Sequence, residues 1–244
     1  MRLLVGLALV VCGAAAVTAQ VPASAQALLT RYRSEIAAVA TGVRGERLEA
    51  AFQRFQLVKD ALMTAPDRQR TVLESLSEEE FSRLQRTIPG ALINRDEVVF
   101  VRPDPDYFLR LAAARGDAAD RAFFAALKAT YPQGVWPAFV KQQTDATGCT
   151  RFGTMALVAA YRRWSEFQRR FPGRYAGQAR EEADAVTEQL TTSTCACGTM
   201  EDVGRELQRF LTTFPDAPVR ADVGRRLRRV RAGESDIRAG CVSG

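Results

Sequence analysis

Apolar residues recur every three or four positions along most of the chain. This spacing places them on one face of an α-helix, where they can pack against a neighbouring helix. The segments with this spacing are 28–39, 48–62, 157–171, 175–190, 203–214 and 219–230. Because helical spacing dominates, the sequence predicts an all-α fold.

Start and stop signals divide this pattern into separate helices. Ser77 and Glu80 form a capping box, in which the hydroxyl and the carboxylate satisfy free backbone amides at a helix start. Asp104 is an N-cap residue followed by Pro105 at the first helical position. Residues 98–101 are β-branched or aromatic and favour an extended segment. Since a lone strand cannot form a sheet, we expect a linker or the edge of at most one short β hairpin.

Three segments share one signature, in which two large apolar residues one helical turn apart are followed by a helix-ending proline. They are 127–132, 167–172 and 210–215. The offset is 40 residues from Tyr131 to Phe171 and 43 residues from Phe171 to Phe214. Periods of this length are typical of stacked helix pairs. We therefore expect stacked antiparallel helical hairpins, with an irregular helical bundle as the alternative.

The C-terminal half resembles the tetratricopeptide-like repeats of bacterial envelope proteins, whose first helix often ends in an aromatic residue followed by proline. Residues 167–179 and 210–221 carry this resemblance, which extends over roughly the last 120 residues. It implies a helical scaffold whose groove holds a protein or peptide partner.

The first residues have the order of a secretory signal. Arg2 supplies a positive charge, residues 3–17 form an apolar run, and Ala19 ends a small-residue cleavage site. We expect a periplasmic or secreted protein, with lipid anchoring through Cys12 as the alternative. No second apolar run is long enough to span a membrane. The predicted organisation is a signal peptide at 1–19, an N-terminal helical region at 20–95 and a helical-hairpin repeat region with disulfides at 96–244.

Loss of the signal peptide would leave an even set of cysteines in an oxidising compartment. They are Cys149, Cys195, Cys197 and Cys241. Because each pair would flank one helical hairpin, we expect disulfides Cys149–Cys195 and Cys197–Cys241, with the exchange of Cys195 and Cys197 as the second pairing. A four-thiolate zinc site is a further alternative, although the two neighbouring cysteines lack the usual ligand spacing.

The amino-acid composition excludes several classes of catalytic and metal site. The chain has no histidine, which excludes Ser-His-Asp and Cys-His catalysis and zinc motifs that use histidine. The 34 Lys and Arg residues exceed the 28 Asp and Glu residues, for a net charge of +6. This excess permits an anionic partner such as an envelope polymer or lipid headgroups. No nucleic-acid recognition motif, dinucleotide fingerprint, phosphate-binding loop or calcium loop accompanies it, so we expect no nucleic acid and no cofactor.

Two surfaces are candidates for binding. A polar loop holds Thr144 and Asp145, with Tyr131 and Trp136 close by in sequence, and such loops on rigid scaffolds often contact ligands. The densest basic run predicts an anion patch on the outside of one helix. Its members are Arg225, Arg226, Arg228, Arg229 and Arg231.

These observations favour an exported, non-catalytic helical scaffold or binding protein of the bacterial cell envelope, without a metal, that holds a protein or peptide partner. One alternative is an envelope hydrolase that uses Asp or Glu residues, for which Asp104 and Asp106 are a candidate pair. The other is a thiol–disulfide exchange protein that uses Cys195 and Cys197. The latter lacks the βαβ context of thioredoxin-like motifs.

Overall fold

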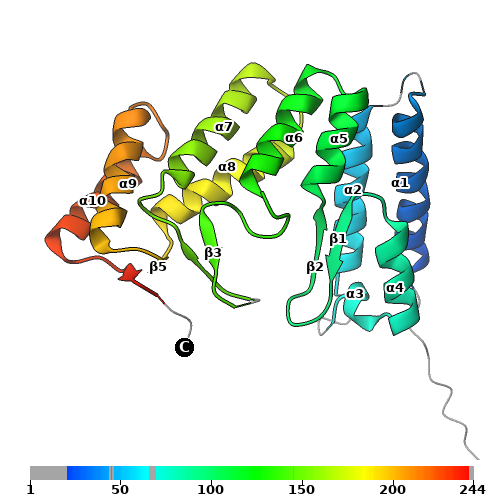
Figure 1. The fold of residues 1–244 in the computed structure, drawn as a ribbon, viewed down its shortest axis with the longest axis horizontal. Coiled ribbons are helices and arrows are strands. Elements are labelled where there is room, and N and C mark those ends of the chain that lie inside the picture. The colour runs from blue at the N-terminus through cyan, green and yellow to red at the C-terminus, as the bar shows by residue number, and fades with distance from the viewer. Residues whose placement is uncertain (1–20, 44, 46, 66–69, 145, 242–244) are drawn as a thin grey trace, which may run out of the picture.

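The computed structural model describes residues 21–43, 45, 47–65, 70–144 and 146–241. Within these residues the chain forms a row of packed helix pairs, from α1 and α2 at one end to α9 and α10 at the other (Figure 1). The helices are α1 (Ala23–Thr41), α2 (Leu48–Met63), α3 (Val72–Ser75), α4 (Glu78–Thr87), α5 (Pro105–Arg115), α6 (Ala118–Thr130), α7 (Ala156–Arg170), α8 (Ala176–Thr191), α9 (Met200–Thr213) and α10 (Arg220–Ala232). The predicted mainly helical fold with packed helix pairs is confirmed.

The predicted signal peptide at 1–19, with Cys12, lies outside the described residues. Among the helices that are described, none is long and apolar enough to cross a membrane.

The prediction of at most one short hairpin is wrong, because two small sheets lie along one edge of the row of helices (Figure 1). β1 (Ala91–Asn94) and β2 (Phe100–Pro103) form an antiparallel hairpin. The second sheet has the strand order β3 (Val140–Gln142), β4 (Gly148–Thr150), β5 (Cys195–Ala196) and β6 (Arg238–Ala239). Its strands are very short and come from distant parts of the chain, so no single stretch carries an alternating pattern that would predict them.

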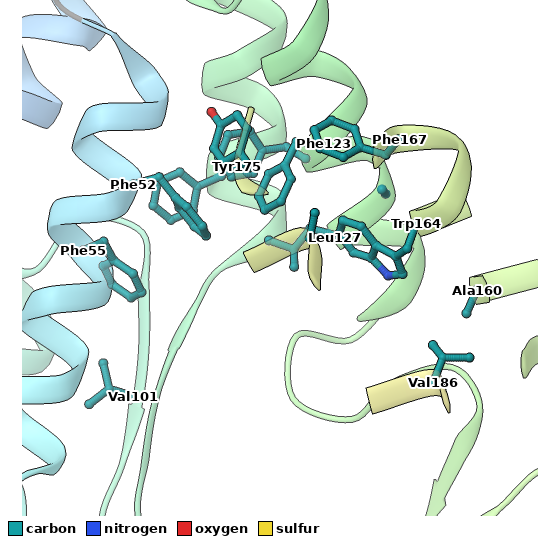
Figure 2. Close-up of a cluster of buried hydrophobic side chains, with 14 of the residues drawn as sticks. Phe52, Phe55, Val101, Phe123, Leu127, Ala160, Trp164, Phe167, Tyr175 and Val186 are labelled. Carbon is teal, nitrogen blue, oxygen red and sulfur yellow. The ribbon is translucent and has the colours of Figure 1, made fainter. Parts of the chain in front are cut away.

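An aromatic cluster joins the N-terminal helices to the later ones. Phe52 of α2 packs edge-on against Phe108 of α5 and Phe123 of α6, with ring centroids 5.1 and 5.4 Å apart. Tyr175, which precedes α8, stacks on Phe123 at 4.0 Å (Figure 2). Trp164 of α7 continues the cluster and is fully buried, as expected for a core residue. A continuous core therefore spans the boundary predicted near residue 95, which itself falls inside the β1–β2 hairpin.

The three repeated segments end their helices in the same way. Tyr131, Phe171 and Phe214 follow the last residues of α6, α7 and α9, with φ between −118° and −129° and ψ between 62° and 72°. The amide of each donates to the carbonyl four residues earlier, and its carbonyl accepts from the amide three residues later. The sequence signature thus encodes a repeated helix-ending turn. A partner helix follows this turn after α7 and α9, whereas β3 follows it after α6.

The start of α7 is capped by a residue from another helix. Met155 precedes α7 with φ 66° and makes no side-chain cap. Instead, the fully buried carboxylate of Glu206 on α9 accepts from the amides of Gly153 at 3.0 Å, Met155 at 2.8 Å and Val158 at 3.4 Å. Gly153 has φ 83°, and a Cβ there would lie 2.8 Å from Asp202, so this close approach requires glycine. One carboxylate therefore ties α9 to the start of α7.

Glu206→Ala is expected to lower the free energy of unfolding by about 3 kcal/mol, because it leaves buried backbone amides without an acceptor. Glu201→Ala is the matched control, since Glu201 lies on the same helix with an exposed side chain, and it is expected to change stability by less than about 0.5 kcal/mol. Urea unfolding of both variants measures the difference. Equal effects of the two substitutions would contradict the capping role.

Candidate functional site

A cavity of about 260 Å³ lies between α2, β2, α6 and α8. Its apolar wall includes Phe52, Val101, Phe123 and Leu127, which Figure 2 shows gathered between these elements. Its polar lining consists of Gln56, Lys59, Arg102, Tyr131, Gln178, Glu181 and Glu182. An apolar wall with a few convergent polar groups is the usual composition of a ligand site.

Arg174 and Tyr175 fix the start of α8 against α2 and α6. The guanidinium of Arg174 pairs with Glu49 of α2, with Asp117 at 2.8 Å and with Asp120 at 3.0 Å. The amide of Tyr175 donates to Glu49 at 2.5 Å, and its hydroxyl donates to Asp120 at 2.7 Å. Because Tyr175 has φ 48° and makes no cap of its own, Glu49 caps α8 from α2. These contacts place the first turns of α8 opposite α2, across the cavity.

Glu182 is a half-buried acid in the cavity lining. The hydroxyl of Tyr131 donates to its Oε2 at 3.0 Å. Burial raises the pKa of Glu182 to about 7, although the hydrogen bond from Tyr131 and the charges of Arg102 and Lys59 act in the opposite direction. Burial also raises the pKa of the Tyr131 hydroxyl above its usual range, so this group keeps its proton. Near neutral pH, Glu182 therefore occurs both as acid and as carboxylate.

Two cations face this acid. Arg102 of β2 donates through Nη1 to the carbonyl of Val135 at 2.5 Å, and its guanidinium lies 5.9 Å from the centroid of the Tyr131 ring. Lys59 of α2 pairs with Asp60 at 3.6 Å. Within the part of the chain that the structure describes, neither cation has a further hydrogen-bond acceptor. Both can therefore donate to a ligand.

Gln56 on α2 and Gln178 on α8 add carboxamides from facing helices. Both side chains are half-buried, and neither hydrogen-bonds to another described residue. A carboxamide presents a donor and an acceptor side by side, which matches the needs of a peptide group. The cavity thus offers charge recognition and amide recognition together.

The structure separates the residues of the predicted ligand-contacting edge. Tyr131 lines the cavity, but Trp136 lines a different hollow, between the β1–β2 hairpin and β3. Thr144 is exposed and its hydroxyl hydrogen-bonds to that of Thr147 at 2.7 Å. Asp145 lies outside the described residues. Of this set, Tyr131 belongs to the candidate site.

The basic run of α10 is divided between surface and interior. Arg226 is buried, and it donates to the carbonyls of Gln189, at 3.2 Å, and Ser193. It is therefore not part of an outward anion patch, because it lies one turn from Val223 on the face that packs inward. The exposed members of the run are Arg225, Arg228, Arg229 and Arg231.

The cysteines pair differently from the first expectation. Cys149 is bonded to Cys197, with Cα atoms 5.1 Å apart, so the predicted pairs Cys149–Cys195 and Cys197–Cys241 are wrong. The thiols of Cys195 and Cys241 hydrogen-bond to each other, which fits the exchanged pairing. Cys149 lies on β4 and Cys195 on β5, which runs between β4 and β6.

This environment opposes thiol–disulfide exchange at the two neighbouring cysteines. Burial, together with the hydrogen bond to Cys241, raises the pKa of Cys195 to about 11. A thiol with a raised pKa is rarely present as the nucleophilic thiolate. The Cys149–Cys197 bond also occupies two of the sulfurs that a zinc site would need. No group of Cys, Asp or Glu side chains in the described ranges is arranged to hold a metal ion.

Sequence reasoning identified Tyr131 but not the acid that it contacts. Gln178 and Glu182 are four residues apart on one face of α8, a spacing that the sequence does show. The sequence does not indicate that α2 and β2 pack near that face of α8. The carboxylates proposed for hydrolysis lie elsewhere, because Asp104 caps α5 and Asp106 pairs with Lys128 at 2.7 Å.

No protein-family model matches the chain, and neither a curated protein nor a solved structure matches it. Function is therefore inferred from the cavity and its chemistry.

The raised pKa of Glu182 predicts a specific loss of stability with pH. An unfolded glutamate releases its proton near pH 4.5 and native Glu182 near pH 7, so the native state binds more protons between these values. Stability is full below the unfolded pKa and falls as pH rises through the folded pKa, by about 3 kcal/mol for this group. Glu182→Gln should remove this component in urea unfolding at pH 5 and pH 8. Glu188→Gln is the control, since Glu188 is exposed on the same helix and outside the cavity lining, and an unchanged pH profile in Glu182→Gln would contradict the assignment.

The Cys149–Cys197 bond leaves Cys195 and Cys241 as free thiols, and we predict a second disulfide between them. With oxidised glutathione, the two thiols are oxidised to a disulfide and glutathione is reduced to two thiols. In Cys241→Ser, alkylation after denaturation should modify Cys195 and leave Cys149–Cys197 intact, as read by peptide fragmentation in a mass spectrometer. Alkylation of Cys197 in that variant would contradict the pairing.

Proposed function

We propose that this protein is a non-catalytic helical scaffold or binding protein that holds a peptide segment of a partner in the cavity between α2, β2, α6 and α8. The proposed setting is the bacterial cell envelope, reached by export directed by residues 1–19. The proposed architecture is a stack of tetratricopeptide-like hairpins, for which the repeated helix-ending turns are the support.

The observation that carries this proposal is that two carboxamides from different helices line the same cavity. Gln56 and Gln178 project from two helices whose relative position is fixed by Arg174 and Tyr175. A peptide presents amide groups between side chains, so it could satisfy both carboxamides while its side chains meet Phe52 and Leu127. A rigid frame lowers the entropy that binding must offset.

Peptide binding is tested with a pool of N-acetylated tripeptides, prepared both as free acids and as C-terminal amides. The full chain is immobilised, and retained peptides are identified by mass spectrometry. The double variant Gln56→Ala, Gln178→Ala is expected to retain at least about tenfold less peptide, because each lost hydrogen bond contributes about 1 kcal/mol.

The matched control for this experiment is Gln53→Ala, since Gln53 is exposed on the same helix as Gln56. It should retain peptides as the wild type does. Absence of retention by the wild type, or equal retention by the double variant, would overturn the proposal.

Hydrolysis by acid catalysis is a second candidate, supported by Glu182. A half-buried glutamate with a pKa of about 7 is suited to donate a proton near neutral pH, and Glu181 is a second carboxylate in the cavity lining. Recovery of shortened peptides from the same pool with wild type, but not with Glu182→Gln, would favour this function over binding alone.

A further inference from the structure

We propose that the group held in the cavity is the C-terminal carboxylate of a peptide, and that Glu182 takes up a proton when this carboxylate binds. This inference rests on the proposed function and names the chemical group that the site recognises. Its basis is the arrangement of two cations and one half-buried acid in a small cavity that is half open to solvent.

The two cations favour an anionic ligand. Lys59 and Arg102 project from α2 and β2 into one cavity, and Val135 holds one end of the guanidinium in place. The remaining donors of Arg102 can form the charge-assisted hydrogen bonds that a carboxylate accepts in a bidentate manner. An ammonium ligand would be repelled by both cations but attracted to Glu181 and Glu182, so the sign of the ligand charge is tested directly below.

The cavity has a volume of about 260 Å³ and is half open to solvent, so one end of a peptide can enter it from the open side. A space of this size accommodates a terminal residue and its carboxylate. Gln56 and Gln178 then lie along the cavity lining where the last amide groups would enter.

The charged and titratable groups around Glu182 explain why a proton accompanies the ligand. Tyr131 faces it from the end of α6, Arg102 from β2 and Lys59 from α2, with Glu181 on its own helix. A ligand carboxylate would engage the two cations that now act on Glu182, and it would add a negative charge beside it. Both changes favour the protonated acid, which can donate a hydrogen bond to the ligand.

The change of affinity with pH distinguishes an anionic ligand from a cationic one. For a carboxylate, affinity should fall as pH rises, by up to about tenfold between pH 6 and pH 8, because ionised Glu182 must first regain its proton. For an ammonium, ionised Glu182 would be the better partner, and affinity should rise over the same range.

The tripeptide pool tests the recognised group directly. Free acids should be retained at least about tenfold more than the same sequences as C-terminal amides, in keeping with a charge-assisted pair. Lys59→Gln should lose this preference, since Lys59 pairs only with its neighbour Asp60 among the described residues and its loss leaves the fold intact. Arg102→Gln should lose the preference too. Arg110→Gln, on the exposed side of α5, should keep it.

The proton is tested on the best-retained free acid by titration calorimetry at pH 7 in phosphate and in Tris. Wild type should take up a fraction of a proton per peptide, because burial raises the pKa of Glu182 to about 7. Glu182→Gln should bind with no proton uptake and with a flat pH profile, since its amide already donates a hydrogen bond.

Each contrary outcome overturns a defined part of the proposal. Equal retention of acids and amides overturns carboxylate recognition but leaves peptide binding in place, whereas retention of neither form overturns the proposed function itself. Retention of amides that contain Asp or Glu, at the level of the free acids, overturns the assignment to the terminal carboxylate. Affinity that rises with pH, or proton release on binding, overturns the role of Glu182.

Discussion

The Arg174–Tyr175 pair before the first turn of α8 ties this helix to α2 and α6. The guanidinium joins Glu49 of α2 to Asp117 and Asp120 at the start of α6, while the Tyr175 ring stacks on Phe123 in the aromatic centre. Buried polar contacts of this kind are favourable only when every partner is satisfied, and here the carboxylates, the guanidinium, the amide and the hydroxyl all are. These contacts hold α8 opposite α2 and β2, across the cavity.

The starts of α7 and α8 are stabilised in the same way, by a residue from another helix pair. α7 and α8 both begin after a non-glycine residue with positive φ, at Met155 and Tyr175, and neither has a capping side chain of its own. In each case a glutamate from another helix pair accepts backbone amides at the helix start: Glu206 accepts three at α7, and Glu49 accepts that of Tyr175 before α8. A helix start without a cap leaves unsatisfied donors. Each of these helices therefore requires another pair for a properly terminated end, which makes the row of pairs cooperative.

The sequence predicted those features that local chemistry determines. The Ser77–Glu80 capping box and the Asp104 cap are present, and Val223 and Leu227 form the expected buried stripe. The sequence did not predict the features that depend on contacts between distant segments of the chain. The spacing of Cys195 and Cys197 could not decide between two pairings, because the position of each sulfur depends on how β4, β5 and β6 meet, and these strands come from distant parts of the chain. Likewise, Glu182 is an ordinary surface position by its sequence, and packing against Tyr131 and β2 gives it its chemistry.

The strand β6 has a mechanical consequence for the end of the chain. After α10, the backbone returns and pairs in parallel with β5, with Cys195 opposite Arg238 and the amide of Cys241 bound to the carbonyl of Ala196. A pulling force transmitted along the chain from residue 241 would therefore act first on β5, between α8 and α9, and not on the last turn of α10. The β5–β6 pairing joins the two ends of the α9–α10 hairpin. Separation of α10 from α9, starting at the C-terminal end, would therefore first require this strand pair to break.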